Sequence, residues 1–128
     1  MKIVGVGLDL IAVERVERLL KRKAGHALDR LLTGAEREYC LGQAVPARHV
    51  AARLAAKEAA YKAFQAAAPA RGIGWRELEV TREADGRPGL KFHGAAEKFS
   101  RELLVESVFV SISHTEDHAL AIVQLATK

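Results

Sequence analysis

An alanine-rich stretch from His49 to Ala68 constrains the fold more than any other part of the sequence, because it contains neither glycine nor proline. Alanine has the highest intrinsic helix propensity of the amino acids, and Pro69 directly follows the stretch. The sequence therefore predicts one long helix that ends before this proline. Since alanine side chains are small, we also expect other segments of the chain to approach this helix closely.

Two charged residues of the predicted helix, Glu58 and Lys62, are four positions apart, so their side chains share one face, one turn from each other. One interpretation is an ordinary surface ion pair of small energetic value. Three further ionisable residues, Arg53, Lys57 and Tyr61, are interspersed with the same alanines. Because a carboxylate that neighbouring segments half bury needs a cation, the second interpretation is a functional cluster around Glu58.

The other segments predict an α+β fold, in which a mainly antiparallel sheet packs against the long helix. Met1–Leu10 has the composition of a strand, and its Gly5 and Gly7 leave room for a close backbone contact. Apolar residues at helical spacing predict a helix over Ile11–Lys23 that ends at Gly25. Further helical segments, one opened by a capping box, and four more strands follow. These segments are Leu28–Leu32, Thr33–Gln43, Trp75–Arg82, Leu90–Phe92, Gly94–Leu104, Val108–Ser113 and Ala119–Leu125.

Asp9 lies at the end of the first predicted strand and allows two interpretations. Aspartate is a common helix N-cap, so its role could be limited to capping the helix that follows. The other interpretation is a carboxylate that projects from the strand end and pairs in space with Glu58. Both interpretations remain open from the sequence alone.

The helix after Asp9 carries a basic stripe, in which Arg15, Arg18 and Arg22 recur at helical spacing. Such a stripe is either a solvated face or a docking surface for an acidic helix. The net charge of +4 and the isoelectric point near 9.5 also predict an acidic partner. Charge alone does not choose among nucleic acid, a phosphate-rich ligand and an acidic protein.

Two connections between predicted strands contain further candidates. Ala84–Gly89 has turn composition and predicts a plain hairpin connection, although its Arg87 could also contact a phosphate. His114 and His118 enclose two acidic residues, as in a metal cluster. In an extended chain, however, residues four positions apart lie about 13 Å from each other, too far to share an ion. We therefore expect a tight turn with one useful histidine, His114.

Length and composition predict a single domain over residues 1–128 in a reducing compartment, the cytoplasm. The only cysteine, Cys40, excludes an internal disulfide, and we expect it to be a packed side chain rather than a nucleophile. Asp9 interrupts the short N-terminal apolar run, so we expect no export segment. No apolar stretch reaches the length of a membrane span, so we expect no membrane partner.

Three motifs, near the start, middle and end of the chain, carry a resemblance to a known family. They are Gly5-Val-Gly-Leu-Asp9-Leu-Ile, Arg53-Leu-Ala-Ala-Lys57-Glu58-Ala-Ala-Tyr-Lys62-Ala-Phe and Val110-Ser-Ile-Ser-His114-Thr. With Leu31-Leu-Thr-Gly-Ala-Glu36 and Gly86-Arg-Pro88, they resemble the holo-acyl-carrier-protein synthases, the small bacterial-type branch of the 4'-phosphopantetheinyl transferases. The resemblance covers essentially the whole chain and implies the fold of that family.

The resemblance implies transfer of the phosphopantetheine arm of coenzyme A to a serine hydroxyl of an apo acyl carrier protein, with release of adenosine 3',5'-bisphosphate. Asp9 and Glu58 are similar to the family's ligands for Mg²⁺, and Lys62 would stabilise charge on the phosphates. Either Glu58 or a metal-bound water would accept the serine proton. The implied process is fatty acid biosynthesis, with carrier activation for polyketide or other secondary metabolism as the alternative.

The same resemblance implies further binding residues and an assembly. Arg15 stands at the carrier-contacting position, with Arg18 and Arg22 beside it. The family's short members form homotrimers with sites between subunits, so Asp9 with Glu58 could face His114 of another subunit. The implied coenzyme A contacts are Arg53, Lys62, Gly86, Arg87, Pro88, Ser113, His114 and Thr115.

Two other classes of function remain as alternatives. A nucleic-acid-binding module would use the same basic surface, but aromatic residues make up only 5% of the chain and no known reader motif is present, so we expect no nucleic acid partner. In a structural trimer without activity, the pair of Glu58 and Lys62 would be dispensable.

Overall fold

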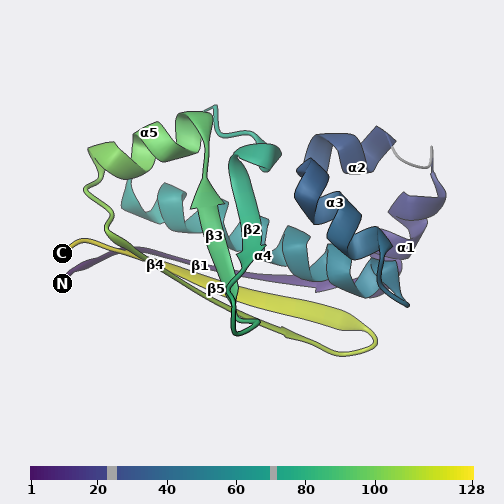
Figure 1. Ribbon diagram of the computed structural model, residues 1–128. Coiled ribbons are helices and arrows are strands. Elements are labelled where there is room, and N and C mark those ends of the chain that lie inside the picture. Colours follow the sequence, from purple (N-terminus) through teal and green to yellow (C-terminus); the bar gives the residue numbers. More distant parts are fainter. Residues whose placement is uncertain (23–25, 70–71) are drawn as a thin grey trace.

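The computed structural model describes residues 1–22, 26–69 and 72–128. The predicted order of one strand, several helices and four more strands is confirmed (Figure 1). The predicted helix within the last part of the chain lies between the second and third of these four strands. The elements are β1 (Ile3–Ala12), α1 (Val13–Lys21), α2 (His26–Leu31), α3 (Gly34–Leu41), α4 (Pro46–Ala67), the 3₁₀ turn η1 (Trp75–Glu77), β2 (Leu78–Arg82), β3 (Pro88–Phe92), α5 (Gly94–Glu102), β4 (Ser107–His114) and β5 (His118–Ala126).

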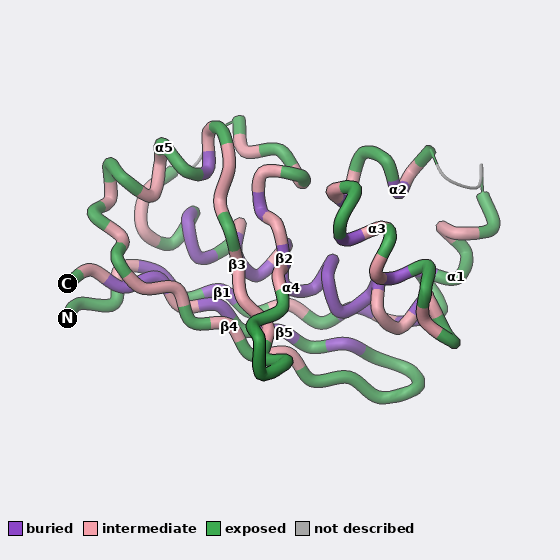
Figure 2. Tube along the Cα trace, in the orientation of Figure 1, coloured by how far each residue is buried: buried purple, intermediate pink, exposed green. Residues whose placement is uncertain are grey.

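Helix α4 is the long helix that the alanine-rich stretch predicts. Pro46 lies in its first turn, where a missing backbone N–H costs nothing, and the helix ends before Pro69. Most residues of α4 are buried, because β1 and β5 pack along one side while α1, α3 and β2 contact other sides (Figure 2). The helix therefore forms the centre of the hydrophobic core.

All strand pairs are antiparallel, as predicted, but they form two sheets rather than one. The larger sheet has the order β1-β5-β4, and β2 and β3 form a separate hairpin that runs at a steep angle to it in Figure 1. Leu78 and Val80 of β2 point into the core, as their alternation predicts, and β3 contacts β4. The α+β fold with a long helix against an antiparallel sheet is thus confirmed.

Glycine and alanine allow β1 to lie directly against α4. A Cβ atom on Gly5 would overlap the backbone carbonyl of Ala63, and one on Gly7 would overlap that of Ala59. The predicted close backbone approach is confirmed at both glycines. This contact fixes how far along α4 each residue of β1 lies, and it positions the end of the strand beside the middle of the helix.

The face of the larger sheet that points away from α4 is apolar and exposed. Figure 2 shows the alternation of buried and exposed residues that produces this face. Leu8 pairs with Ile122 and Leu10 with Leu120, and all four side chains are exposed, as is Phe109 of β4. In the described ranges, no helix combines the length and the hydropathy that a membrane crossing needs.

Two segments differ from the sequence-based expectation. Strand β1 continues to Ala12, so α1 begins at Val13, and the expected helix end at Lys23 and Gly25 lies outside the described residues. The segment from Trp75 begins as a 3₁₀ turn rather than a strand. Its cause is Glu77, whose backbone N–H bonds the carbonyl of Gly74 while its carboxylate accepts the N–H of Gly74 at 2.6 Å.

Candidate functional site

Asp9 and Lys62 meet where β1 crosses the middle of α4. The Nζ atom of Lys62 donates to Oδ1 of Asp9 at 2.9 Å and to the backbone oxygen of Leu8 at 3.1 Å. The cap of α1 is Ala12, so Asp9 does not serve as its N-cap. The capping role of Asp9 is therefore wrong, its carboxylate pairs with Lys62, and its pairing with Glu58 stays a prediction.

Glu58 lies one turn before Lys62 on α4 and is half-buried. Within the described part of the chain it forms no ion pair, because Lys62 pairs with Asp9 instead. The simple surface pair of Glu58 with Lys62, which the sequence left open, is thus not formed. Its carboxylate remains available to a ligand.

Asp9 and Glu58 have the chemistry of a partial site for a hard divalent cation. Mg²⁺ in enzymes is commonly held by one or two carboxylates, with substrate phosphates and waters as its other ligands. No group of three or more His, Cys, Asp and Glu side chains converges within residues 1–22, 26–69 and 72–128, so these residues form no complete protein cage. Lys62 already balances the charge of Asp9, so a bound cation would have to share or replace this contact. The donors fit Mg²⁺ that is shared with a phosphate-bearing substrate.

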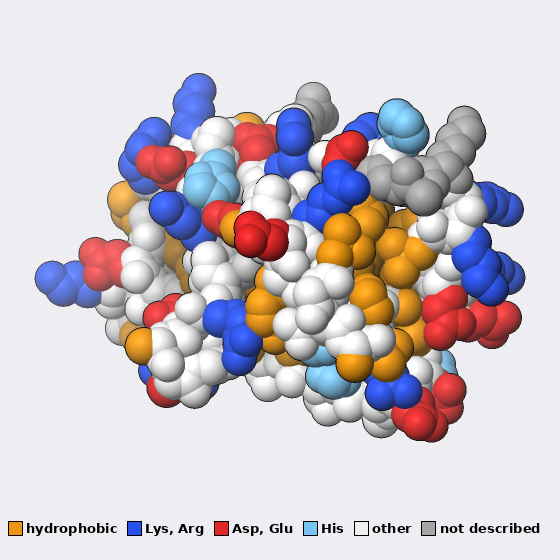
Figure 3. All heavy atoms as spheres, turned by 45° about the vertical axis from the view of Figure 1, so that its right-hand side comes forward, with side chains coloured by type: hydrophobic (Ala, Val, Ile, Leu, Met, Phe, Trp, Pro, Cys, Tyr) orange, Lys and Arg blue, Asp and Glu red, His pale blue; other side chains and the backbone are white. Residues whose placement is uncertain are grey.

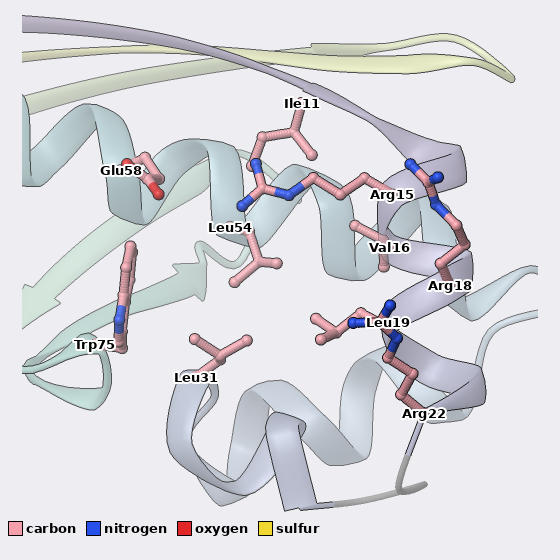
Figure 4. A pocket seen from close by; sticks show the side chains of 10 residues that line it. All are labelled: Ile11, Arg15, Val16, Arg18, Leu19, Arg22, Leu31, Leu54, Glu58 and Trp75. Carbon is pink, nitrogen blue, oxygen red and sulfur yellow. The ribbon is translucent and has the colours of Figure 1, made fainter.

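A cavity of about 380 Å³ joins Glu58 to the basic stripe of α1. Arg15, Arg18 and Arg22 all line it, and apolar residues that include Leu54 form its inner surface. Figure 4 shows Arg15 extending across the cavity in the direction of Glu58, while Arg18 and Arg22 lie on the opposite side. In Figure 3, hydrophobic side chains form a hollow on this end of the molecule, with basic side chains beside it. The stripe is therefore part of a cavity wall and more than a solvated face.

A second, basic pocket of about 190 Å³ lies between α4, the β2–β3 hairpin and the end of β4. It brings together four of the predicted coenzyme A contacts, which are Arg53, Gly86, Pro88 and His114. The structure adds three residues that the sequence analysis missed, which are Tyr39, His49 and Arg82. His49 precedes Arg53 by one helical turn, and this spacing was the only available signal for it.

Aromatic stacking organises the basic pocket. The guanidinium carbon of Arg53 lies 4.3 Å from the ring centroid of Tyr39, and that of Arg82 lies 4.8 Å from the same centroid. The ring of His49 lies 5.8 Å from that of Tyr39 and 6.0 Å from that of His114. Two guanidinium groups and two imidazoles thus line the same small pocket.

The electrostatics of this pocket favour an anion. Burial lowers the pKa of His49 below its ordinary value, and the nearby charge of Arg53 lowers it further, followed by those of His114, Arg82 and Arg48. The Nε atom of Arg53 is buried and has no hydrogen-bond partner among the described residues. A buried donor without a partner is costly, so a phosphate or another acceptor would relieve it.

Besides Lys62, which contacts Asp9, three other predicted contacts do not line this pocket. Arg87 is exposed and pairs with Asp85, its Nε lying 2.7 Å from Oδ2. Ser113 is exposed on β4, and the hydroxyl of Thr115 accepts the N–H groups of Asp117 and His118 in the turn before β5. This turn is the tight connection that the sequence predicts.

Cys40 is a packed side chain, as predicted. It is fully buried, and burial is the main reason why the pKa of its thiol is raised to about 11. A thiol with so high a pKa is a poor nucleophile at neutral pH.

Comparison with known proteins gives a consistent result over almost the whole chain. The family model for the 4'-phosphopantetheinyl transferase superfamily matches residues 5–123. A holo-[acyl-carrier-protein] synthase of Geobacter sulfurreducens is 39% identical over 123 residues, which cover 96% of this chain and 97% of that protein. One of Alkalilimnicola ehrlichii is 44% identical over 124 residues, which cover 96% of both proteins.

Solved structures show the same similarity in three dimensions. Holo-[acyl-carrier-protein] synthase from Neisseria meningitidis superposes with a TM-score of 0.86 at 30% identity, covering 98% of this chain and 100% of that chain. The synthase from Bacillus anthracis, solved in complex with coenzyme A (3',5'-ADP), gives a TM-score of 0.76 at 31% identity and covers 98% of both chains.

Proposed function

The chain belongs to the 4'-phosphopantetheinyl transferase superfamily, as a holo-[acyl-carrier-protein] synthase, and from this membership we propose its reaction. It transfers the phosphopantetheine arm of coenzyme A to a serine hydroxyl of an apo acyl carrier protein and releases adenosine 3',5'-bisphosphate. One observation carries the proposal. Asp9 contacts Lys62, and Glu58, one turn before that lysine, lines the cavity that the arginines of α1 border.

The residues of the cluster have complementary roles in the proposed reaction. The serine oxygen attacks the phosphorus that bears the pantetheine arm, its proton moves to a base, and the bisphosphate leaves with the electrons of the broken P–O bond. The acceptor of the proton is either Glu58, which makes no ion pair among the described residues, or a water molecule beside it. Lys62 stabilises the negative charge that grows on the phosphates. Asp9 and Glu58 would hold Mg²⁺, which when bound would neutralise phosphate charge and orient the group for in-line displacement.

The basic pocket binds the nucleotide end of coenzyme A in this proposal. Arg53, Arg82 and the two histidines supply positive charge or donors for phosphate oxygens, and Gly86 and Pro88 border the same pocket. Support comes from the buried Nε of Arg53, which has no partner in the described structure. Arg87, Ser113 and Thr115 remain predicted contacts, and they would reach the ligand from outside this pocket.

We further propose a homotrimer in which each coenzyme A site combines two subunits. Within one chain, Glu58 and His114 line different cavities. The exposed apolar face of the larger sheet, with Leu8, Leu10 and Ile122, is a surface that association would bury. An interface of this kind would bring the basic pocket of one subunit to the acidic cluster of the next.

The carrier docks on α1 in the same proposal. Carrier helices with acidic residues would meet Arg15, Arg18 and Arg22, and the cavity beneath them leads to Glu58. We assign the single-domain enzyme to the cytoplasm and to fatty acid biosynthesis, with carriers of polyketide or other secondary metabolism as the alternative. Competition between purified apo carriers would distinguish these substrates.

Mass spectrometry tests the reaction directly. An apo carrier protein incubated with the enzyme, coenzyme A and Mg²⁺ should gain the mass of one phosphopantetheine. Glu58→Gln and Asp9→Asn should remove this gain while circular dichroism shows an intact fold. An unmodified carrier in the presence of the folded parent enzyme and Mg²⁺ would refute the proposal.

A further inference from the structure

Lys57, the residue that precedes Glu58 in α4, belongs to a fully buried ion pair. The Nζ atom of Lys57 is 2.6 Å from Oε1 of Glu36, and neither side chain has any exposed surface. Burial acts to lower the pKa of Lys57, and the nearby Glu36 opposes this effect. A buried ion pair seldom adds stability compared with apolar residues of the same size. Stability alone therefore does not explain this pair.

Each partner of this pair holds backbone groups of other elements. Glu36 accepts the N–H of Thr33 at 2.8 Å, completing the capping box of α3, and the N–H of Val80 in β2 at 2.8 Å. Lys57 donates to the backbone oxygen of Trp75 at 2.9 Å. The pair thus ties the start of α3, the middle of α4, strand β2 and the turn η1 to one point.

Trp75 connects this buried pair to the candidate site. Its side chain lines the 380 Å³ cavity beside Arg15 and Glu58, and it also lines an apolar cavity of about 270 Å³ to which Glu58 and Tyr61 contribute. Figure 4 shows the indole standing across from Glu58 at one end of the larger cavity. The indole is therefore a wall shared by the two cavities that meet at Glu58.

We propose that Lys57, held by Glu36, is a positioning residue that fixes the indole of Trp75 as the wall beside Glu58. The role of this wall in carrier modification rests on the function proposed above. The backbone oxygen of Trp75 already accepts the N–H of Leu78, and the bond from Lys57 adds a second donor that ties the turn to α4. Without this bond, η1 loses a hydrogen bond to the helix that bears Glu58.

Fluorescence tests the proposal because Trp75 is the only tryptophan in the chain. The double variant Lys57→Met/Glu36→Gln removes both charges together, which avoids leaving one buried and unpaired. We expect circular dichroism like that of the parent, a red shift of the tryptophan emission and a larger acrylamide quenching constant. A matched control is Arg101→Met/Glu97→Gln, which removes an exposed ion pair on α5 and should leave the emission unchanged.

A folded double variant with the emission and quenching of the parent would overturn the proposal. A second measurement, on the unmodified protein, covers the case in which the variant does not fold. The fluorescence anisotropy of Trp75 should then decay only with the tumbling of the whole molecule. A large, fast component of the decay would show a mobile indole and would equally overturn the proposal.

Transfer kinetics test the consequence for catalysis. Trp75→Ala and the double variant should each lower kcat, while KM for coenzyme A stays near that of the parent. Because both changes act through the same wall, their combination should lower kcat no further than either alone. Losses that multiply would contradict this coupling. An inactive parent enzyme would instead refute the proposed function, and the fluorescence results would still decide the positioning role.

Discussion

The Nζ atom of Lys62 lies 2.9 Å from Oδ1 of Asp9, although 53 positions separate the two residues in the chain. This contact depends on the glycines of β1, which allow the strand to lie against the alanines of α4. It also means that a protein cation already neutralises one of the two carboxylates proposed to hold Mg²⁺. Lys62 and the metal ion should therefore compete for Asp9 when no phosphate is present.

Replacing Lys62 should strengthen metal binding while it weakens catalysis. Lys62→Met frees Asp9 for Mg²⁺, and because the lysine is half exposed, the lost ion pair contributes only about 0.2–1 kcal/mol. We expect Mg²⁺ affinity without coenzyme A to rise by up to about fivefold, measured by titration calorimetry. Transfer activity should fall, because the phosphates lose a cation. Weaker metal binding in this variant would show that Lys62 supports the site rather than competing in it.

Inactive subunits should complement each other if the site spans two chains. Glu58→Gln and His114→Gln subunits, co-expressed with different affinity tags and purified for both, should regain activity that neither shows alone. In a cyclic trimer that contains both kinds of subunit, about one site in three combines an intact Glu58 with an intact His114. The matched control pairs Glu58→Gln with Asp9→Asn, which belong to the same half of the site and should not complement. Failure of the first pair to regain activity would place the whole site within one subunit.

The parts of the fold that the sequence predicted depend on local rules. Alanine content and Pro69 define α4, and the capping box from Thr33 to Glu36 forms as its spacing indicates. The turn around Gly86 joins two strands of a hairpin for the same reason. Each of these features is decided by residues within a few positions of one another.

Features that depend on tertiary contacts were not accessible in this way. Lys57 was recognised only as an ionisable neighbour of Glu58, because its partner Glu36 belongs to another helix. Tyr39 and Arg82 join Arg53 only after α3 and the β2–β3 hairpin have packed beside α4. Asp9 meets Lys62 only because β1 packs against α4, and the pairing of Asp9 with Glu58 stays a prediction.

His49 should make the stability of the protein sensitive to acid. Its pKa is lowered in the folded state from the ordinary 6.5, first by burial and then by Arg53, so the folded protein resists its protonation. The contribution of His49 to the free energy of unfolding is fully present above the pKa that it has in the unfolded chain. This contribution is lost as the pH falls through the lower pKa of the folded state. We expect the drop in Tm between about pH 7.5 and about pH 5 to be smaller in His49→Gln than in the parent. An equal drop in both proteins would contradict this role.

A methyl group on Gly7 should separate β1 from α4. Gly7→Ala forces its Cβ into the carbonyl of Ala59, and overpacking of this kind costs about 1–3 kcal/mol. Because Asp9 follows two residues later on the same strand, the shift should also pull its carboxylate away from Lys62. Urea unfolding should show the loss of stability, and transfer activity measured well below the unfolding midpoint should fall further than the folded fraction explains.

Gly34→Ala is the matched control, because the Cβ it would add meets no described residue within 4 Å apart from its chain neighbours and the backbone of α3, and the residue is exposed in the first turn of α3. Its stability should stay within about 0.5 kcal/mol of the parent, with full activity. A Gly7→Ala protein as stable as this control would mean that β1 and α4 are free to move apart at no cost. In that case the strand would not fix the position of Asp9, and the meeting of Asp9 with Lys62 would need another cause.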